Sequence, residues 1–252
     1  MASLHEQYRP RKWADVAGQP EAVAAIQRTL ARGWGGRAWW ITGVSGAGKT
    51  TLAKLIAAEG ADELAIDEQS AGGLTTARLR DLERGYQSRT LFGKGGHCVI
   101  VNECHGLRRD TVRELLDVLE RLPAHVTWIF TTTKQGQTSL FEDDESGDCA
   151  PLVSRCVEIE LENTSQSRQA LAKRAKAVGM AAGCDGLPES VYGAAIDACK
   201  GNMRALLQRV ESGQLAKEAE REWRRYLSQP LDKQDKVERA RVQGLIAELQ
   251  RA

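Results

Sequence analysis

The sequence lacks any pair of cysteines at C-x-x-C spacing, although it contains six cysteines. Zinc ribbons and disulfide frameworks both depend on regularly spaced cysteines, so the sequence argues against both. Cys98 and Cys156 lie in strand-like runs, and we expect them to be small buried hydrophobic residues. His97 and His105 are close in sequence, but no third ligand follows at metal spacing, so we expect neither to bind a metal.

The sequence also lacks a long apolar run and a strong excess of either charge. No apolar stretch approaches membrane-spanning length and the N-terminus has no signal-peptide core, so we expect a cytoplasmic protein without membrane contact. The net charge is +1, so any nucleic-acid contact must come from a local basic patch. The 252 residues suit one α/β domain and a smaller second domain.

One stretch carries a specific chemical pattern. Residues 43–50 read Gly-Val-Ser-Gly-Ala-Gly-Lys-Thr and match G-x-x-x-x-G-K-[ST] at every fixed position. Glycines let the backbone N–H groups wrap a polyphosphate, and the positive end of the following helix faces the anion. A bulky strand-like run precedes the loop and an apolar helical face follows it, which favours a phosphate-binding loop over an ordinary glycine-rich turn.

We therefore predict a site for ATP and Mg²⁺ at this loop. Lys49 would contact the outer phosphates, and the Thr50 hydroxyl would bind the metal. The predicted nucleotide-binding residues of the loop are Gly43, Val44, Ser45, Gly46, Ala47, Gly48, Lys49, Thr50 and Thr51.

Two later strands end in polar residues. The apolar run 97–101 is typical of a strand buried on both faces of a parallel sheet, and Asn102 and Glu103 follow it. We expect Glu103 to polarise an attacking water. Asn102 stands where P-loop ATPases carry an Mg²⁺-associated Asp, and its amide would reach the metal through a water without bringing charge. The run 126–133 is a second such strand, and it ends in three threonine hydroxyls, of which one could hold the attacking water.

The remaining segments complete the predicted layout. A helix over 75–84 exposes Arg78 and Arg80, which is either a solvated face or a basic patch. The acidic segment 134–153 is predicted to be a surface loop. From residue 164 the pattern is helical. We predict domains at 1–162 for the nucleotide-binding core, 163–212 for a three-helix lid and 213–252 for a charged helical tail.

Taken in order, these motifs resemble the AAA+ clamp-loader ATPases, namely small replication factor C subunits and the bacterial DNA polymerase III gamma/tau subunit. The resemblance covers roughly residues 6 to 212. The Ser-Arg-Cys run at 154–156 is its most discriminating piece. The matching runs are 8–10 with 16–19, 43–50, 99–105, 115–120, 128–133, 154–156 and 201–204.

The resemblance implies a role for several single residues. Arg155 corresponds to an arginine finger that acts on ATP of a neighbouring subunit; the alternative is an unpaired surface arginine. Thr133, or less closely Thr132, corresponds to sensor 1, and Arg204 to sensor 2. Arg78 and Arg80 become candidates for DNA contact. The arm next to the nucleotide base corresponds to Tyr8, Arg9, Pro10 and Val16.

The resemblance also implies a fold and partners. We expect an α/β AAA+ core with a five-stranded parallel sheet, a small all-helical lid and a helical tail. The expected partners are other clamp-loader subunits in an oligomer, a sliding clamp and primer–template DNA. The chain departs from the family at Asn102, lacks its cysteine-rich zinc insertion, and keeps its third helical domain at most as the charged tail.

Three functions fit these observations. The first is a clamp-loader ATPase subunit that hydrolyses ATP to load a sliding clamp on primed DNA. The second is a nucleotide-dependent switch or scaffold subunit with slow turnover, which Asn102 favours. The third is a related AAA+ motor for branched DNA.

Overall fold

The computed structural model describes residues 2–88, 93–133, 150–184, 187–228 and 236–249. The chain forms two compact units. One unit spans Pro10–Glu162, and the other combines Met1–Arg9 with Asn163–Ala252.

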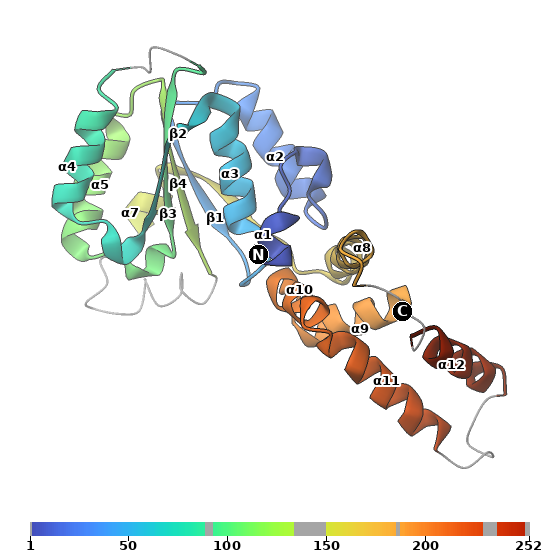
Figure 1. The fold of residues 1–252 in the computed structure, drawn as a ribbon. Coiled ribbons are helices and arrows are strands. Elements are labelled where there is room, and N and C mark those ends of the chain that lie inside the picture. Colours follow the sequence, from blue (N-terminus) through green and yellow to red (C-terminus); the bar gives the residue numbers. More distant parts are fainter. Residues whose placement is uncertain (1, 89–92, 134–149, 185–186, 229–235, 250–252) are drawn as a thin grey trace. The chain divides into compact units, whose positions relative to one another are not determined.

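The first unit is built on one five-stranded sheet with the order β2-β3-β4-β1-β5, and every pairing in it is parallel (Figure 1). The predicted α/β class with a five-stranded parallel sheet is therefore confirmed. The strands are β1 (Arg37–Thr42), β2 (Ala61–Ser70), β3 (Gly96–Asn102), β4 (Val126–Thr132) and β5 (Cys156–Glu160).

Helices cover both faces of this sheet, as Figure 1 shows: α2 and α3 lie on one face, and α4 and α5 lie on the other. Trp39 and Trp40 are neighbours in β1 and therefore point to opposite faces, yet both are fully buried. Burial on both faces explains why the strand sequences are continuous apolar runs. The elements of these layers are α2 (Pro20–Leu30), α3 (Lys49–Gly60), α4 (Thr76–Gly85), α5 (Arg109–Glu120) and α7 (Ala150–Val153), with short 3-10 helices η1 (Trp13–Asp15), η2 (Ala71–Gly73) and η3 (Cys104–Gly106).

The acidic loop predicted for residues 134–153 is only partly described. Residues 134–149 lie outside the described residues. The last four residues were wrongly assigned to the loop, because Ala150–Val153 form the short helix α7. Its residues Leu152 and Val153 are buried in the same hydrophobic cluster as Trp40 and Phe130, which holds this turn on the sheet.

The second unit consists of helices. Two of them begin at side-chain caps: the Thr164 hydroxyl accepts from the backbone N–H of Ser167, and the Asn202 amide oxygen accepts from that of Ala205. The helices of this unit are α1 (Leu4–Gln7), α8 (Ser165–Ala181), α9 (Glu189–Ala198), α10 (Met203–Glu211), α11 (Gln214–Leu227) and α12 (Lys236–Leu249).

The N-terminal residues group with the helical unit and not with the sheet. Leu4 is buried, and its backbone N–H donates to the Glu211 carboxylate at 3.4 Å, so α1 packs on α10. Apart from this regrouping of residues 1–9, the proposed division at 1–162, 163–212 and 213–252 stays a prediction.

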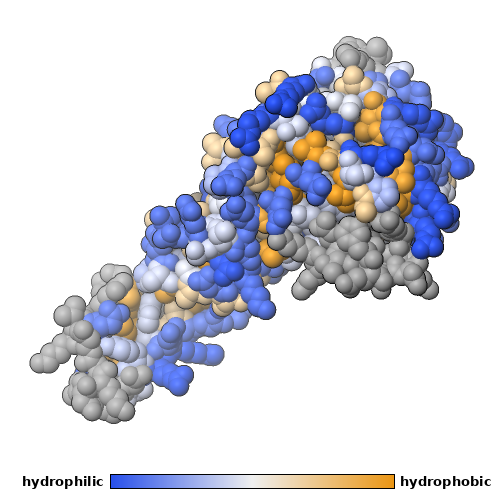
Figure 2. All heavy atoms as spheres, turned by 180° about the vertical axis from the view of Figure 1, so that it is seen from behind, coloured by the Kyte–Doolittle hydropathy of each residue, from blue (hydrophilic) through white to orange (hydrophobic). Residues whose placement is uncertain are grey.

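The face drawn in Figure 2 is largely hydrophilic. Hydrophilic residues cover much of this face, and hydrophobic residues gather on part of the Pro10–Glu162 unit. Among the described helices, none is long and apolar enough to cross a membrane.

Two glycines make room for the Trp34 ring where α3 meets β3. The Trp34 indole N–H donates to the Ile56 carbonyl at 2.6 Å. A Cβ atom on Gly60 would lie 2.0 Å from a ring carbon of Trp34, and one on Gly96 would lie 2.6 Å from another. Small residues are therefore required at both positions.

We expect Gly60→Ala to lower the free energy of unfolding by about 1–3 kcal/mol, because the added methyl group must displace a packed indole ring. Gly85→Ala is the matched control, since Gly85 also lies in a helix and a Cβ there meets nothing within 4 Å. The control should be neutral or stabilise by up to about 1 kcal/mol. Urea denaturation followed by tryptophan fluorescence measures both, and equal stability of the two variants would contradict the packing argument.

Candidate nucleotide site

The P-loop connects β1 to α3. β1 ends at Thr42, and α3 begins at Lys49 with Gly48 at its N-cap in a left-handed conformation (φ 107°, ψ 10°). A side chain would be strained at that dihedral, and a Cβ on Gly43 would lie 2.8 Å from that of Leu161. The glycines at both ends of the motif are thus required by the backbone path, and the loop leads directly into a helix N-terminus.

Lys49 lies across the loop it belongs to. Its side chain is buried, and the ammonium group donates to the carbonyl oxygens of Gly43 at 3.0 Å and Val44 at 2.9 Å. A buried ammonium needs acceptors, because desolvation without them is costly. Phosphate oxygens held by the loop would compete for the same donors and, being charged, would form stronger bonds.

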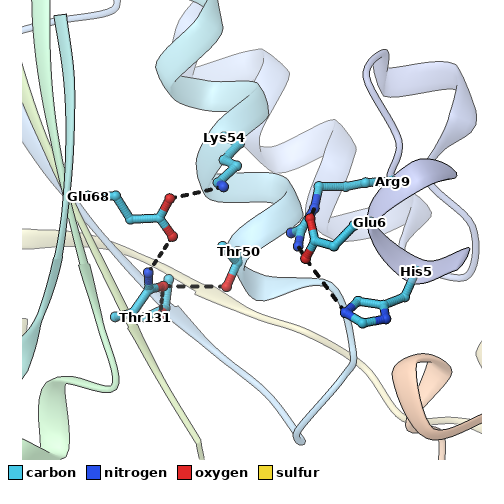
Figure 3. A network of polar contacts seen from close by, with 8 residues as sticks. His5, Glu6, Arg9, Thr50, Lys54, Glu68 and Thr131 are labelled. Carbon is cyan, nitrogen blue, oxygen red and sulfur yellow. Dashed lines mark hydrogen bonds and ion pairs between the residues drawn. The ribbon is translucent and has the colours of Figure 1, made fainter. Parts of the chain in front are cut away.

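Asn102 is the last residue of β3 and joins three neighbouring elements. Its amide oxygen accepts from the Thr50 hydroxyl at 3.4 Å and from the Thr131 hydroxyl at 3.0 Å. Its amide nitrogen donates to Glu68 Oε1 at 2.8 Å, and the other oxygen of Glu68 lies 2.9 Å from Lys54 Nζ. Figure 3 shows Thr50, Thr131 and Glu68 meeting here from α3, β4 and β2, while Lys54 of α3 reaches Glu68. Asn102 therefore lies beside the hydroxyl predicted to bind Mg²⁺.

Glu103 follows β3 in an unusual backbone conformation. Its φ of 57° and ψ of 52° place it in the left-handed region, which a residue other than glycine rarely occupies. Such strain is concentrated at functional sites, where it directs a side chain. The Glu103 carboxylate is more than half exposed and lies 3.4 Å from His105 Nδ1, so it is available to water.

The threonines at the end of β4 differ in what they contact. Thr131 is fully buried and donates to Asn102, whereas the Thr132 hydroxyl donates to the carbonyl of Thr133 at 3.3 Å. Thr133 follows the end of β4, and its proposed role as sensor 1 stays a prediction. Thr131 is a site residue that the sequence did not single out, although its position in the Thr-Thr-Thr run made it one of three candidates.

The donor set fits magnesium held jointly with phosphates. Mg²⁺ prefers oxygen ligands and is commonly bound by one or two protein groups together with phosphate oxygens and waters. Thr50 supplies a hydroxyl oxygen, and Asn102 supplies an oxygen next to it. Within the described residues, no group of three His, Cys, Asp or Glu side chains forms a cage of its own. These residues therefore suit a metal that arrives with a nucleotide.

Arg155 is held by its own chain. Its guanidinium donates to Glu120 Oε1 at 3.0 Å and to the Pro151 carbonyl at 2.9 Å, and it lies at the end of α7 beside β5. Both side chains of the ion pair are partly exposed. Exposed ion pairs contribute only about 0–1 kcal/mol, so this arginine can exchange its partner at little cost.

The other predicted residues lie in different places. Arg78 pairs with Asp67 at 3.0 Å and Arg80 with Glu114 at 2.7 Å, so each candidate for DNA contact has a local carboxylate. Val16 packs against the hydrophobic cluster that contains the buried residues of α3. Val16 and Pro10 both belong to the sheet unit. Tyr8, Arg9 and Arg204 belong to the helical unit; Arg9 pairs with Glu6, and Arg204 is exposed.

Two of the described cysteines, Cys98 and Cys156, are poorly suited to act as nucleophiles. Cys98 is buried in the sheet, and desolvation raises the pKa of its thiol. Burial likewise raises the pKa of Cys156 to about 12. Both thiols therefore stay protonated at neutral pH; Cys98 is a buried core residue as expected, whereas Cys156 is only partly buried against the core.

Thr131→Val tests the hydrogen bond that supports Asn102. Removing the hydroxyl deprives a partly buried amide oxygen of a donor, so we expect the free energy of unfolding to fall by about 1–2 kcal/mol. Thr127→Val is the matched control: Thr127 is buried in the same strand but donates to the Trp34 carbonyl at 2.8 Å. Both variants should lose similar stability in urea, but only Thr131→Val should weaken the stabilisation that added Mg·ATP gives in a thermal-shift assay. An equal response of the two variants to Mg·ATP would contradict this assignment.

Several curated proteins are similar to this chain in sequence. The gamma subunit of DNA polymerase III from Buchnera aphidicola subsp. Acyrthosiphon pisum is 25% identical over 187 residues, which cover 66% of this chain and 49% of the relative. The tau subunit from Salmonella typhimurium is 29% identical over 154 residues, covering 52% and 24%. The chain thus spans at most about half the length of these relatives. No family model matches the chain.

Solved structures show the same fold. RuvB from Thermotoga maritima matches with a TM-score of 0.60 at 20% identity, over 81% of this chain and 65% of that one. NtrX from Brucella abortus in complex with ADP matches with a TM-score of 0.53 at 19% identity, over 82% and 52%. The comparisons therefore confirm both the AAA+ fold and the resemblance to the gamma and tau subunits of bacterial DNA polymerase III that the sequence motifs indicate.

Proposed function

We propose that the chain is a clamp-loader-type ATPase subunit, which binds Mg·ATP and hydrolyses it while a sliding clamp is loaded on primer–template DNA. The observation that supports this most is the meeting of the P-loop with the end of β3, where Thr50 contacts Asn102 and Glu103 follows. The names of the relatives support the replication role.

Each residue of the site then has a chemical task. The loop N–H groups and Lys49 hold the phosphates, and Thr50 binds the metal. Glu103 orients a water and accepts its proton on a carboxylate oxygen as the water attacks the terminal phosphorus and ADP leaves. Bound Mg·ATP supplies the reacting phosphoryl group; the residues position it and stabilise the developing charge.

Arg155 completes the site of a neighbouring subunit in this proposal. It would leave Glu120 and approach the terminal phosphate of the neighbour, where a cation stabilises the transition state. Arg204 would correspond to sensor 2 of the family, the arginine that reports the γ-phosphate of bound ATP, and Tyr8, Arg9 and Pro10 to the arm near the base. The family resemblance supports these three assignments.

A second candidate function follows from Asn102. An amide in place of a carboxylate brings no charge to the metal, so the chain could bind ATP and act as a switch or scaffold with slow turnover. Turnover of the wild type beside Asn102→Asp and Glu103→Gln separates the two functions. Wild-type turnover equal to that of Asn102→Asp, and abolished in Glu103→Gln, would remove the switch alternative.

Three variants test the assigned roles. Lys49→Ala should abolish detectable binding of a fluorescent ATP analogue, because the phosphates lose their main cation.

Glu103→Gln should keep the affinity for the ATP analogue but lower the rate of ATP turnover by about 10²–10⁴-fold, since proton transfer is lost. Unchanged hydrolysis in Glu103→Gln would contradict the proposed chemistry.

Arg155→Ala should keep its own affinity for ATP, yet lower the ATP turnover of the assembled complex by about 10³-fold.

The partner assignment has its own experiment. ATP hydrolysis by the chain, alone and mixed with candidate loader subunits, is measured with a sliding clamp plus primed DNA or with four-way junctions. Stimulation by clamp and primed DNA is expected, because closure of neighbouring subunits places Arg155 in trans. Stimulation by four-way junctions alone would favour the branched-DNA motor. Mass measurement with and without ATP reports whether an oligomer forms.

A further inference from the structure

Position 102, beside the hydroxyl predicted to bind Mg²⁺, carries an amide in place of a carboxylate. The Asn102 amide is, however, hydrogen-bonded to the carboxylate of Glu68. Glu68 comes from β2, the edge strand next to β3. Register pairs Glu68 with Ile100 and Ser70 with Asn102, so Glu68 and Asn102 lie two residues apart on one face of the sheet. That face is the one covered by α3, which carries Thr50 and Lys54.

Glu68 determines which way the Asn102 amide points. An ionised carboxylate only accepts hydrogen bonds, so the amide nitrogen must face Glu68 Oε1, at 2.8 Å. The amide oxygen is then directed at the Thr50 and Thr131 hydroxyls, which donate to it. Without Glu68 the amide could turn its nitrogen toward Thr50 and present a donor where a metal-bound water needs an acceptor.

Glu68 is itself anchored. Lys54 lies one helical turn after Thr50 on α3, and its ammonium group is 2.9 Å from Glu68 Oε2. The other oxygen of the carboxylate remains with Asn102. Each oxygen of the carboxylate thus has its own donor, from two different elements, and because the Lys54–Glu68 pair is partly exposed it contributes only about 0–1 kcal/mol.

We propose that Glu68 and Asn102 act as one unit that replaces the single Asp expected at position 102, with Asn102 presenting the oxygen and Glu68 orienting it and supplying the charge. This rests on the proposed function, and it makes Glu68 a positioning residue for bound Mg²⁺. It also explains the amide: an Asp at position 102 would face Glu68 as a second carboxylate, and like charges at such contact repel. The pair carries one negative charge in place of two.

The first experiment measures the magnesium requirement of nucleotide binding. A fluorescent ATP analogue is titrated with MgCl₂ on the full chain. Glu68→Gln should raise the Mg²⁺ concentration for half-maximal affinity by about three- to tenfold, while affinity in EDTA stays unchanged. Glu63→Gln is the matched control, an exposed glutamate on the same strand, and should behave as the wild type.

The second experiment exchanges the charge within the pair. Asn102→Asp alone should lower the urea midpoint, because two carboxylates face each other. The double variant Glu68→Gln with Asn102→Asp should recover the midpoint and the wild-type Mg²⁺ requirement, since a Gln amide can donate to the new carboxylate. The effect of Asn102→Asp on ATP turnover is therefore best measured in the Glu68→Gln variant, where the two carboxylates do not repel each other.

The outcomes separate the two proposals. If the wild type binds the analogue and Glu68→Gln has an unaltered Mg²⁺ requirement, the role of Glu68 is overturned and the proposed function stands. If the wild type binds no Mg·nucleotide, both are overturned. Additive effects of the two substitutions on the urea midpoint would show that Glu68 and Asn102 do not act as one unit.

Discussion

The parallel pairing of β1, β3 and β4 is the constraint on which the candidate site depends. β4 lies between the other two, with Thr42 of β1 level with Thr132 and Val101 of β3 level with Phe130. All three strands therefore end at one edge of the sheet, where functional groups of open α/β sheets gather. The P-loop, Asn102 and the Thr131 hydroxyl meet because this register holds. The buried tryptophans help to keep it, because a slip of one residue would move each ring to the opposite face of the sheet and away from the side chains it packs against.

Two cations, Lys49 and Arg155, share one feature: each is held by a partner that it can exchange. Lys49 donates to carbonyls of its own loop, and Arg155 to Glu120 and a carbonyl of α7. Neutral carbonyls and an exposed carboxylate are weak competitors for a polyphosphate. Asn102 differs, because its amide is bonded on both sides and its orientation is set by the fold. Binding would thus rearrange the cations while the acceptor beside the metal stays in place.

Much of the fold could be predicted because its signals are local. Strand, glycine-rich loop and helix follow one another within 37–60, and apolar runs marked the buried strands. The short helix at 150–153 was missed because its signal is two residues, Leu152 and Val153, whose burial depends on the distant sheet. The grouping of residues 1–9 was missed for the same reason, since Leu4 finds its partner more than two hundred residues later.

The sequence by itself determined the P-loop, the polar ends of the strands and the replacement of Asp by Asn102, because each is a pattern of neighbouring residues. Only the tertiary structure decided that Glu68 supports Asn102, that Thr131 among the three threonines contacts it, and that Arg155 pairs with Glu120. The contacts of Asn102 depend on strand register, including the irregular pairing of β2 with β3 between Ala61 and Ile66, and the Arg155–Glu120 pair depends on the packing of α5 beside α7. Which residues face each other at that register depends on packing between segments that are far apart in the chain, so the apolar pattern of one segment alone does not reveal it.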